Sequence, residues 1–109
     1  MRTVCETMAL HFVPAVRSMI ARDLIEGYKM TQKEAAKRLG MTQPAVSQYK
    51  KHLRGIRTKM LERNDTVEKM VTRVSGLLAK NEIGPEEAAL EICGICKYMR
   101  ERKMVGKMI

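Results

Sequence analysis

Apolar and polar residues follow one another along this chain with the period of a helix rather than that of a strand. Apolar side chains recur at intervals of three and four residues in the segments that begin near Val16, Val46, Val67 and Ala89. That spacing places them on one face of an α-helix. No segment keeps the two-residue alternation of a half-buried strand for long enough to support a sheet. The sequence therefore predicts an all-α fold.

Three amphipathic helices are predicted outside the centre of the chain. The first begins at Pro14, because proline is tolerated in a first helical turn; the second covers residues 64–81, with Asp65 and Glu68 as a cap-like pair; the last begins at Pro85. The apolar face of the first helix consists of Val16, Met19, Ile20, Leu24 and Tyr28. That of the second consists of Val67, Met70, Val71, Val74, Leu77 and Leu78. That of the last consists of Ala89, Ile92, Cys93, Cys96 and Met99.

The central segment, MTQKEAAKRLGMTQPAVSQYKKHLRG at residues 30–55, begins with the signals of one short helix. Thr31 and Glu34 fit a capping box, in which each side chain accepts from the backbone N–H of the other residue. Ala35, Ala36 and Leu39 form its apolar face. Gly40 ends this helix, since glycine is the usual residue where the chain must turn left-handed.

A second short helix is predicted directly after this corner. Thr42 is its expected N-cap, and Pro44 lies in the first turn, where a missing N–H costs nothing. Its apolar stripe consists of Val46, Tyr49 and Leu53, and we expect it to continue to Gly55.

Two short helices joined by a turn of three or four residues form a helix-turn-helix unit. We expect Ala36 where the helices cross, Gly40 at the corner and Val46 in the crevice beside Ala36. The predicted fold is therefore a small helical domain that contains a helix-turn-helix, followed by a two-helix C-terminal extension. Residues 1–60 form the helix-turn-helix region, and residues 61–109 either complete its core or pair two chains along the stripe of the second amphipathic helix.

The chain carries a net charge of +9 and has a pI of about 9.8. This balance favours an anionic partner such as nucleic acid or a membrane surface, although a basic surface without such a role is an alternative. Positive charge is concentrated behind the two short helices, where residues 50–63 hold six Lys or Arg against one Glu. That position favours DNA.

The stretch QKEAAKRLGMTQPAVSQY resembles the helix-turn-helix of the Cro/repressor class of transcription factors. The wider pattern is similar to that of small archaeal regulators: a CE pair near the start, VPAVRSMIARDLIE before the motif and a CxxC near the end. The resemblance implies a transcription regulator whose second short helix enters the major groove of DNA.

The resemblance also implies residue roles. Residues at the start of the second short helix would contact bases, and a glutamine there can pair with adenine; they are Gln43, Pro44, Ala45, Ser47 and Gln48. Residues around them would contact phosphates; they are Gln32, which would also brace Gln43, and Thr42, Lys50, Lys51, Arg54 and Arg57. We expect double-stranded DNA as the partner, a homodimer on paired half-sites, and no cofactor requirement for DNA binding.

Other function classes receive less support. No catalytic set of side chains and no phosphate-binding loop is recognisable, so we expect no enzymatic activity. No apolar run approaches the roughly 20 residues of a membrane span, and no secretion signal is recognisable. We therefore expect a cytoplasmic protein without a membrane partner. A helix-turn-helix used as a protein-interaction module is an alternative.

The three cysteines, Cys5, Cys93 and Cys96, suit a reducing compartment. They are interpreted as buried structural thiols, with two alternatives: a metal or iron–sulfur site of a thiol-ligated sensor or carrier that uses all three, or a redox pair at Cys93 and Cys96. On a helix, residues three apart have Cβ atoms about 5–6 Å apart, whereas an unstrained disulfide needs about 3.5–4.5 Å.

Overall fold

The structure, a computed structural model, describes residues 12–53, 59 and 61–101, except for the side chains of Lys50 and His52. All regular structure in this part of the chain is helical, which confirms the all-α prediction. In chain order the elements are α2 (Val13–Arg22), the π-helix η2 (Asp23–Gly27), α3 (Gln32–Leu39), α4 (Gln43–Ser47), α5 (Tyr49–Leu53), α7 (Asp65–Ala79) and α8 (Pro85–Glu101).

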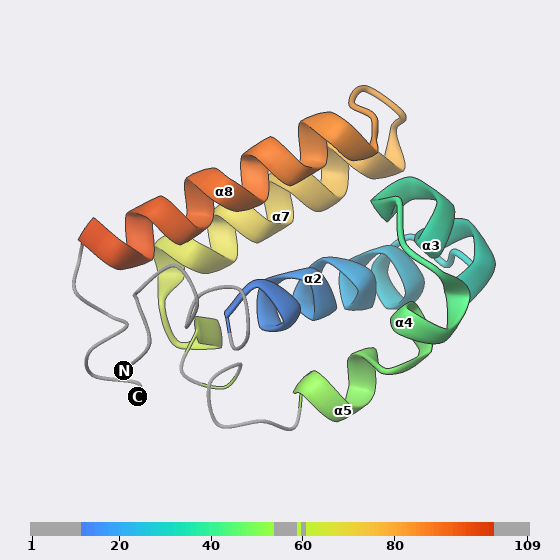
Figure 1. Cartoon of the computed structure of the whole chain (residues 1–109), viewed down its shortest axis with the longest axis horizontal. Helices are drawn as coiled ribbons and strands as arrows, with labels where there is room; N and C mark the ends of the chain where they lie inside the picture. Colours follow the sequence, from blue (N-terminus) through green and yellow to red (C-terminus); the bar gives the residue numbers. More distant parts are fainter. Residues whose placement is uncertain (1–11, 54–58, 60, 102–109) are drawn as a thin grey trace.

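Helix α2 forms the centre of the molecule. Figure 1 shows it between the antiparallel pair α7 and α8 on one side and α5 on the other, with α3 and α4 at one end. A helix that contacts other elements on several sides is apolar over most of its surface. Its buried residues are Ala15, Val16, Ser18, Met19, Ile20 and Ala21.

The end of this central helix differs from the prediction at Tyr28. The chain widens into η2, where the Tyr28 N–H donates to the Asp23 carbonyl at 3.1 Å, five residues back. This wider turn rotates the following residues away from the apolar stripe. Leu24 stays buried, whereas Tyr28 is 45% exposed, so its assignment to the apolar face was wrong.

Helix α7 lies with its apolar stripe against the core. Its N-cap is Asn64, whose side chain accepts from the Val67 N–H at 3.0 Å, so the cap-like pair predicted at Asp65 and Glu68 was wrong. The residues buried on α7 are Val67, Val71, Val74, Ser75 and Leu78. This stripe is therefore covered by other parts of the same chain.

Helix α8 begins at Pro85, as predicted, but turns a different face inward. The buried residues are Ala88, Ile92, Ile95 and Met99, whereas the predicted Ala89 and Cys93 are exposed. Small or apolar residues lie on adjoining faces of this helix, so the pattern alone does not select one. The bulkier Ile95 gains more from burial than Cys93 does, which favours the observed orientation.

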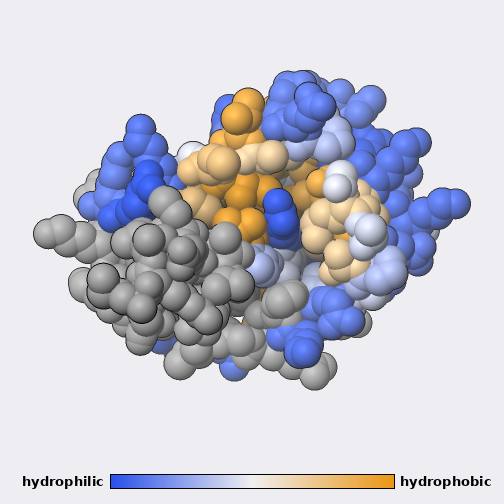
Figure 2. Space-filling model, viewed as in Figure 1, coloured by the Kyte–Doolittle hydropathy of each residue, from blue (hydrophilic) through white to orange (hydrophobic). Residues whose placement is uncertain are grey.

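Apolar side chains also gather at one place on the surface. Figure 2 shows them between α8 and the α3–α4 corner, with hydrophilic side chains above and to the right.

No helix in the described part of the chain is long and apolar enough to cross a membrane.

Candidate nucleic-acid interface

Helix α3 has the N-cap and the C-terminal turn that the sequence predicts. The Thr31 Oγ1 accepts from the Glu34 N–H at 3.1 Å. Gly40 has φ +66°, and the Met41 N–H donates to the Ala36 carbonyl at 2.9 Å, which closes the helix end. The second half of the capping box was wrong, because the Glu34 carboxylate instead accepts from Arg38 Nε at 2.9 Å.

The corner between α3 and α4 is packed tightly on its inner side. Ala36 is 4% exposed and Val46 is 1% exposed, and both belong to the hydrophobic core. A Cβ added to Gly40 would lie 2.8 Å from the Cβ of Pro85, the first residue of α8. The turn therefore needs glycine both for its left-handed backbone and for this close approach. The approach to Pro85 was not predicted.

Helix α4 is shorter than predicted. The Thr42 Oγ1 accepts from the Ala45 N–H at 3.3 Å and caps its start. Ser47 Oγ donates back to the Pro44 carbonyl at 2.8 Å, and the Gln48 N–H donates to the Ala45 carbonyl at 3.3 Å. These tighter bonds form a turn at Gln48, so the helix expected to continue unbroken is divided into α4 and α5.

The predicted base-contacting residues lie on the outer side of this corner. Gln43, Pro44, Ser47 and Gln48 are exposed, and Ala45 is half-buried. Within the part of the chain that the structure describes, the amide groups of Gln43 and Gln48 form no hydrogen bond. Their donors and acceptors are therefore available to a partner.

The predicted phosphate-contacting residues are placed only in part. Gln32, Thr42 and Lys51 are exposed. The side chain of Lys50 lies outside the described structure, as do Arg54 and Arg57. Gln32 and Gln43 form no hydrogen bond with each other among the described residues, so the expected brace between them is not formed here.

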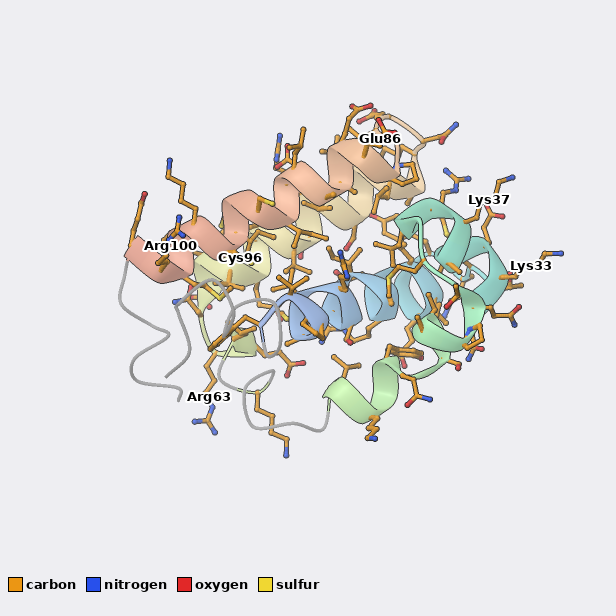
Figure 3. All side chains as sticks on the ribbon, viewed as in Figure 1. Lys33, Lys37, Arg63, Glu86, Cys96 and Arg100 are labelled. Atoms are coloured by element: carbon orange, nitrogen blue, oxygen red, sulfur yellow. The ribbon has the colours of Figure 1, made fainter. Side chains whose placement is uncertain are left out.

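Two further lysines lie close to the predicted base-contacting residues. A groove of about 450 Å³ between α3 and the start of α4 is lined by Thr31, Lys33, Glu34, Ala36, Lys37, Met41 and Gln43. Figure 3 shows the side chains of Lys33 and Lys37 extending outward from α3. They were not predicted as contacts, although their spacing of four residues already places them on one face of the helix.

Helix α3 is tied to the end of α7 by Arg38. Its Nη1 donates to the Leu78 carbonyl at 3.0 Å, while its Nε holds Glu34. A basic side chain that satisfies a carbonyl in the last turn of a helix stabilises that helix end. The contact spans 40 residues of sequence, so it links the α3–α4 corner to the C-terminal pair of helices.

A second polar link joins α2 to α7. Arg22 lies 2.9 Å from Glu62, 3.3 Å from Asp23 and 3.7 Å from Glu68, and Ser75 Oγ donates to Asp23 at 3.0 Å. Burial lowers the pKa of Arg22, but the three carboxylates together raise this pKa by more than burial lowers it. The guanidinium group therefore stays protonated. Burial raises the pKa of Glu68 and outweighs the opposing effect of Arg22. The network holds α2 and α7 in one arrangement.

The two described cysteines do not form one buried pair. Cys93 is exposed, so its interpretation as a buried thiol was wrong, and Cys96 is half-buried. Burial, and then the neighbouring Cys93, raise the pKa of Cys96 to about 11, which keeps it a thiol at neutral pH. Cys5 lies outside the described residues, among which no cluster of three metal-ligating side chains occurs. A site that uses all three cysteines stays a prediction.

Comparison with known proteins agrees with this geometry over the middle of the chain. Residues 22–63 match a family model described as helix-turn-helix, which supports the class of DNA-binding transcription regulators. No curated protein sequence matches the chain significantly. No solved structure matches the chain significantly either. The match says nothing about source, so the similarity to archaeal regulators stays a prediction.

Proposed function

We propose that this protein is a sequence-specific DNA-binding transcription regulator that reads the major groove with α4. In helix-turn-helix proteins the N-terminal residues of the second helix contact base edges. The observation that carries the proposal is the outer side of the α3–α4 corner, where Gln43 and Gln48 are exposed with free amide groups above a buried Val46.

Direct readout is assigned to the polar side chains of α4 and its end. A glutamine amide can donate to and accept from the edge of adenine at the same time, which makes Gln43 the first candidate, followed by Gln48 and Ser47. Pro44 and Ala45 offer apolar contact to a thymine methyl group. Ser47 already donates its hydroxyl hydrogen to the Pro44 carbonyl, so it acts as an acceptor.

Sequence-independent affinity is assigned to the groups that surround this face. Thr42 and Gln32 are exposed beside it, and Lys33 and Lys37 line the groove that reaches Gln43. Lys51 is exposed on α5, and the other predicted phosphate contacts, Lys50, Arg54 and Arg57, lie close to it in the sequence. Each phosphate neutralised by a cationic side chain releases counterions, which is where such binding gains most of its free energy.

The proposed form on DNA is a homodimer, because one short reading helix covers only a few base pairs. Two copies on half-sites about one helical turn apart would multiply the specificity of each. DNA binding in this scheme requires no cofactor, and the proposed role involves no enzymatic step.

The proposal is tested by selecting bound sites from a random library of double-stranded DNA and measuring affinity for the recovered site by fluorescence anisotropy. We expect tighter binding to the selected site than to scrambled DNA, and weaker binding to both as salt rises. Gln43→Ala should lose the preference, whereas Thr72→Ala, an exposed change on α7, should keep it. Failure to bind any duplex at low ionic strength would refute the proposal.

A further inference from the structure

The outward side of α8 is a continuous face that no other described helix covers, although Lys97 on this face lies 4.0 Å from the Glu101 carboxylate of the same helix. Glu86, Leu90, Cys93, Gly94 and Lys97 follow one another on it at helical spacing, and all five are exposed. Leu90 is 72% exposed, the largest value of any large hydrophobic residue in the described structure. The opposite side of the same helix packs on the core, so the five residues, named here the α8 outer face, point away from the molecule.

Gly94 lies in the middle of this face, and no contact among the described residues requires a glycine there. A Cβ added there would meet nothing within 4 Å, whereas a Cβ at Gly40 would meet Pro85 and one at Gly76 would lie 3.3 Å from the Tyr28 hydroxyl. Glycine inside a helix lowers stability relative to alanine. A glycine that no described neighbour requires, beside an exposed leucine, fits a place where another helix approaches closely.

Charge along the α8 outer face is arranged so that it complements itself. Glu86 lies in the first turn of the helix, and Lys97 lies near its end; Figure 3 shows Glu86 at the start of α8, at the opposite end from Arg100. A second copy running antiparallel would therefore place carboxylates beside cations at both ends. With Leu90 opposite the partner's Cys93, the same register sets Glu86 opposite the partner's Lys97.

We propose that the α8 outer face is the seam of a homodimer, formed by two antiparallel copies of α8 around a twofold axis. Each favourable pair then occurs twice, as such symmetry requires. Helix α8 holds four carboxylates against two cations in a chain of net charge +9, so it can pair while basic surfaces elsewhere repel. The stripe of α7 is not available, because the core covers it.

The first experiment exchanges the charges and measures self-association by sedimentation equilibrium without DNA, in about 0.15 M salt. Glu86→Lys and Lys97→Glu should each raise the dimer dissociation constant roughly tenfold, because each turns two attractions into two repulsions. The double variant E86K/K97E restores both pairs and should recover the dimer. The register would be overturned if either single variant had the dissociation constant of the parent. It would also be overturned if the double variant dimerised no more tightly than the single variants.

The second experiment tests the close approach at Leu90 and Gly94. Leu90→Lys should abolish the dimer, while Thr72→Lys adds the same charge to an exposed position of α7 and should leave it intact. Gly94→Ala should raise the thermal midpoint of the chain yet weaken association severalfold, a combination that a purely structural role would not give. Circular dichroism checks that each variant is folded.

A parent protein that stays monomeric up to about 100 μM, or a dimer indifferent to Leu90→Lys, would refute the seam. Because no DNA is present, these results are independent of whether the α3–α4 corner binds DNA.

Discussion

The two sides of the α3–α4 corner differ in what holds their residues in place. On the inner side, Ala36 and Val46 are almost fully buried, and Gly40 is closed in by Pro85. On the outer side, Gln43 and Gln48 are exposed and form no side-chain hydrogen bond in the described structure. The fold therefore constrains one side and leaves the other free for a partner, within fewer than two turns of helix. Changes on the inner side should alter stability, and changes on the outer side should alter binding.

The largest expected effect is that of Gly40→Ala on the inner side. The left-handed backbone costs a residue with a Cβ about 1–2 kcal/mol, and crowding against Pro85 adds about 1–3 kcal/mol. We expect the free energy of unfolding, measured by urea denaturation, to fall by about 2–5 kcal/mol in all. Gly27→Ala is the control, because a Cβ there meets nothing within 4 Å and φ is not positive. Equal effects of the two changes would contradict the account of the corner.

Gln43→Ala on the outer side should leave the free energy of unfolding within about 0.5 kcal/mol of the parent. Affinity for the selected DNA site should fall by about 1–3 kcal/mol, and preference at one base position should relax. Fluorescence anisotropy on the selected and scrambled sites measures both. Equal losses on the two DNAs would remove Gln43 as a base-reading residue while leaving it as a contact.

Lys37→Ala should weaken binding to every duplex by a similar factor. Loss of one phosphate contact should reduce the slope of log affinity against log salt by about 0.9. The measurement is a salt titration on scrambled DNA, with Lys69→Ala, an exposed lysine of α7, as the control. A slope that stays the same for Lys37→Ala would place the DNA away from the groove beside Gln43.

The smallest effect is expected at the polar link between α2 and α7. Burial raises the pKa of Glu68 above its ordinary value of 4.5, so the folded chain holds this proton more readily than the unfolded chain does. Glu68 thus lowers stability at neutral pH, and the penalty disappears as the pH falls through the raised pKa toward 4.5.

Glu68→Gln should therefore stabilise the protein at neutral pH, by less than about 1 kcal/mol because the side chain is partly solvated. The gain should vanish in urea denaturation at pH values below the ordinary pKa. Glu82→Gln, at an exposed position, serves as the control. A loss of stability at neutral pH would mean that attraction to Arg22 outweighs burial.

Local features of the corner were predictable because each depends on residues close in sequence. The Thr31 cap and the left-handed turn at Gly40 follow from side chain and backbone chemistry within four residues. The division at Gln48 is also local, but it depends on Ser47 bonding back to the Pro44 carbonyl, and serine has other options in a helix.

Contacts between distant segments could not be predicted in the same way. The bond from Arg38 to the Leu78 carbonyl and the contact of Gly40 with Pro85 join residues 40 or more positions apart. Neither leaves a periodic signal in the sequence. The face that α8 turns inward was misjudged for a related reason: packing against α2, α3 and α7, which lie far away in the sequence, decides between Ile95 and Cys93.

The central position of α2 has a consequence for experiments that transfer the proposed DNA-binding corner to another protein. Its side chains contact α5 on one flank and α7 and α8 on another. A fragment that ended before Asp65 would uncover the part of α2 that packs against α7 and α8, and it would also lose the helix whose Leu78 carbonyl accepts from Arg38. The α3–α4 corner is therefore not expected to fold without the C-terminal helices, and chimaeras should include α7 and α8 with it.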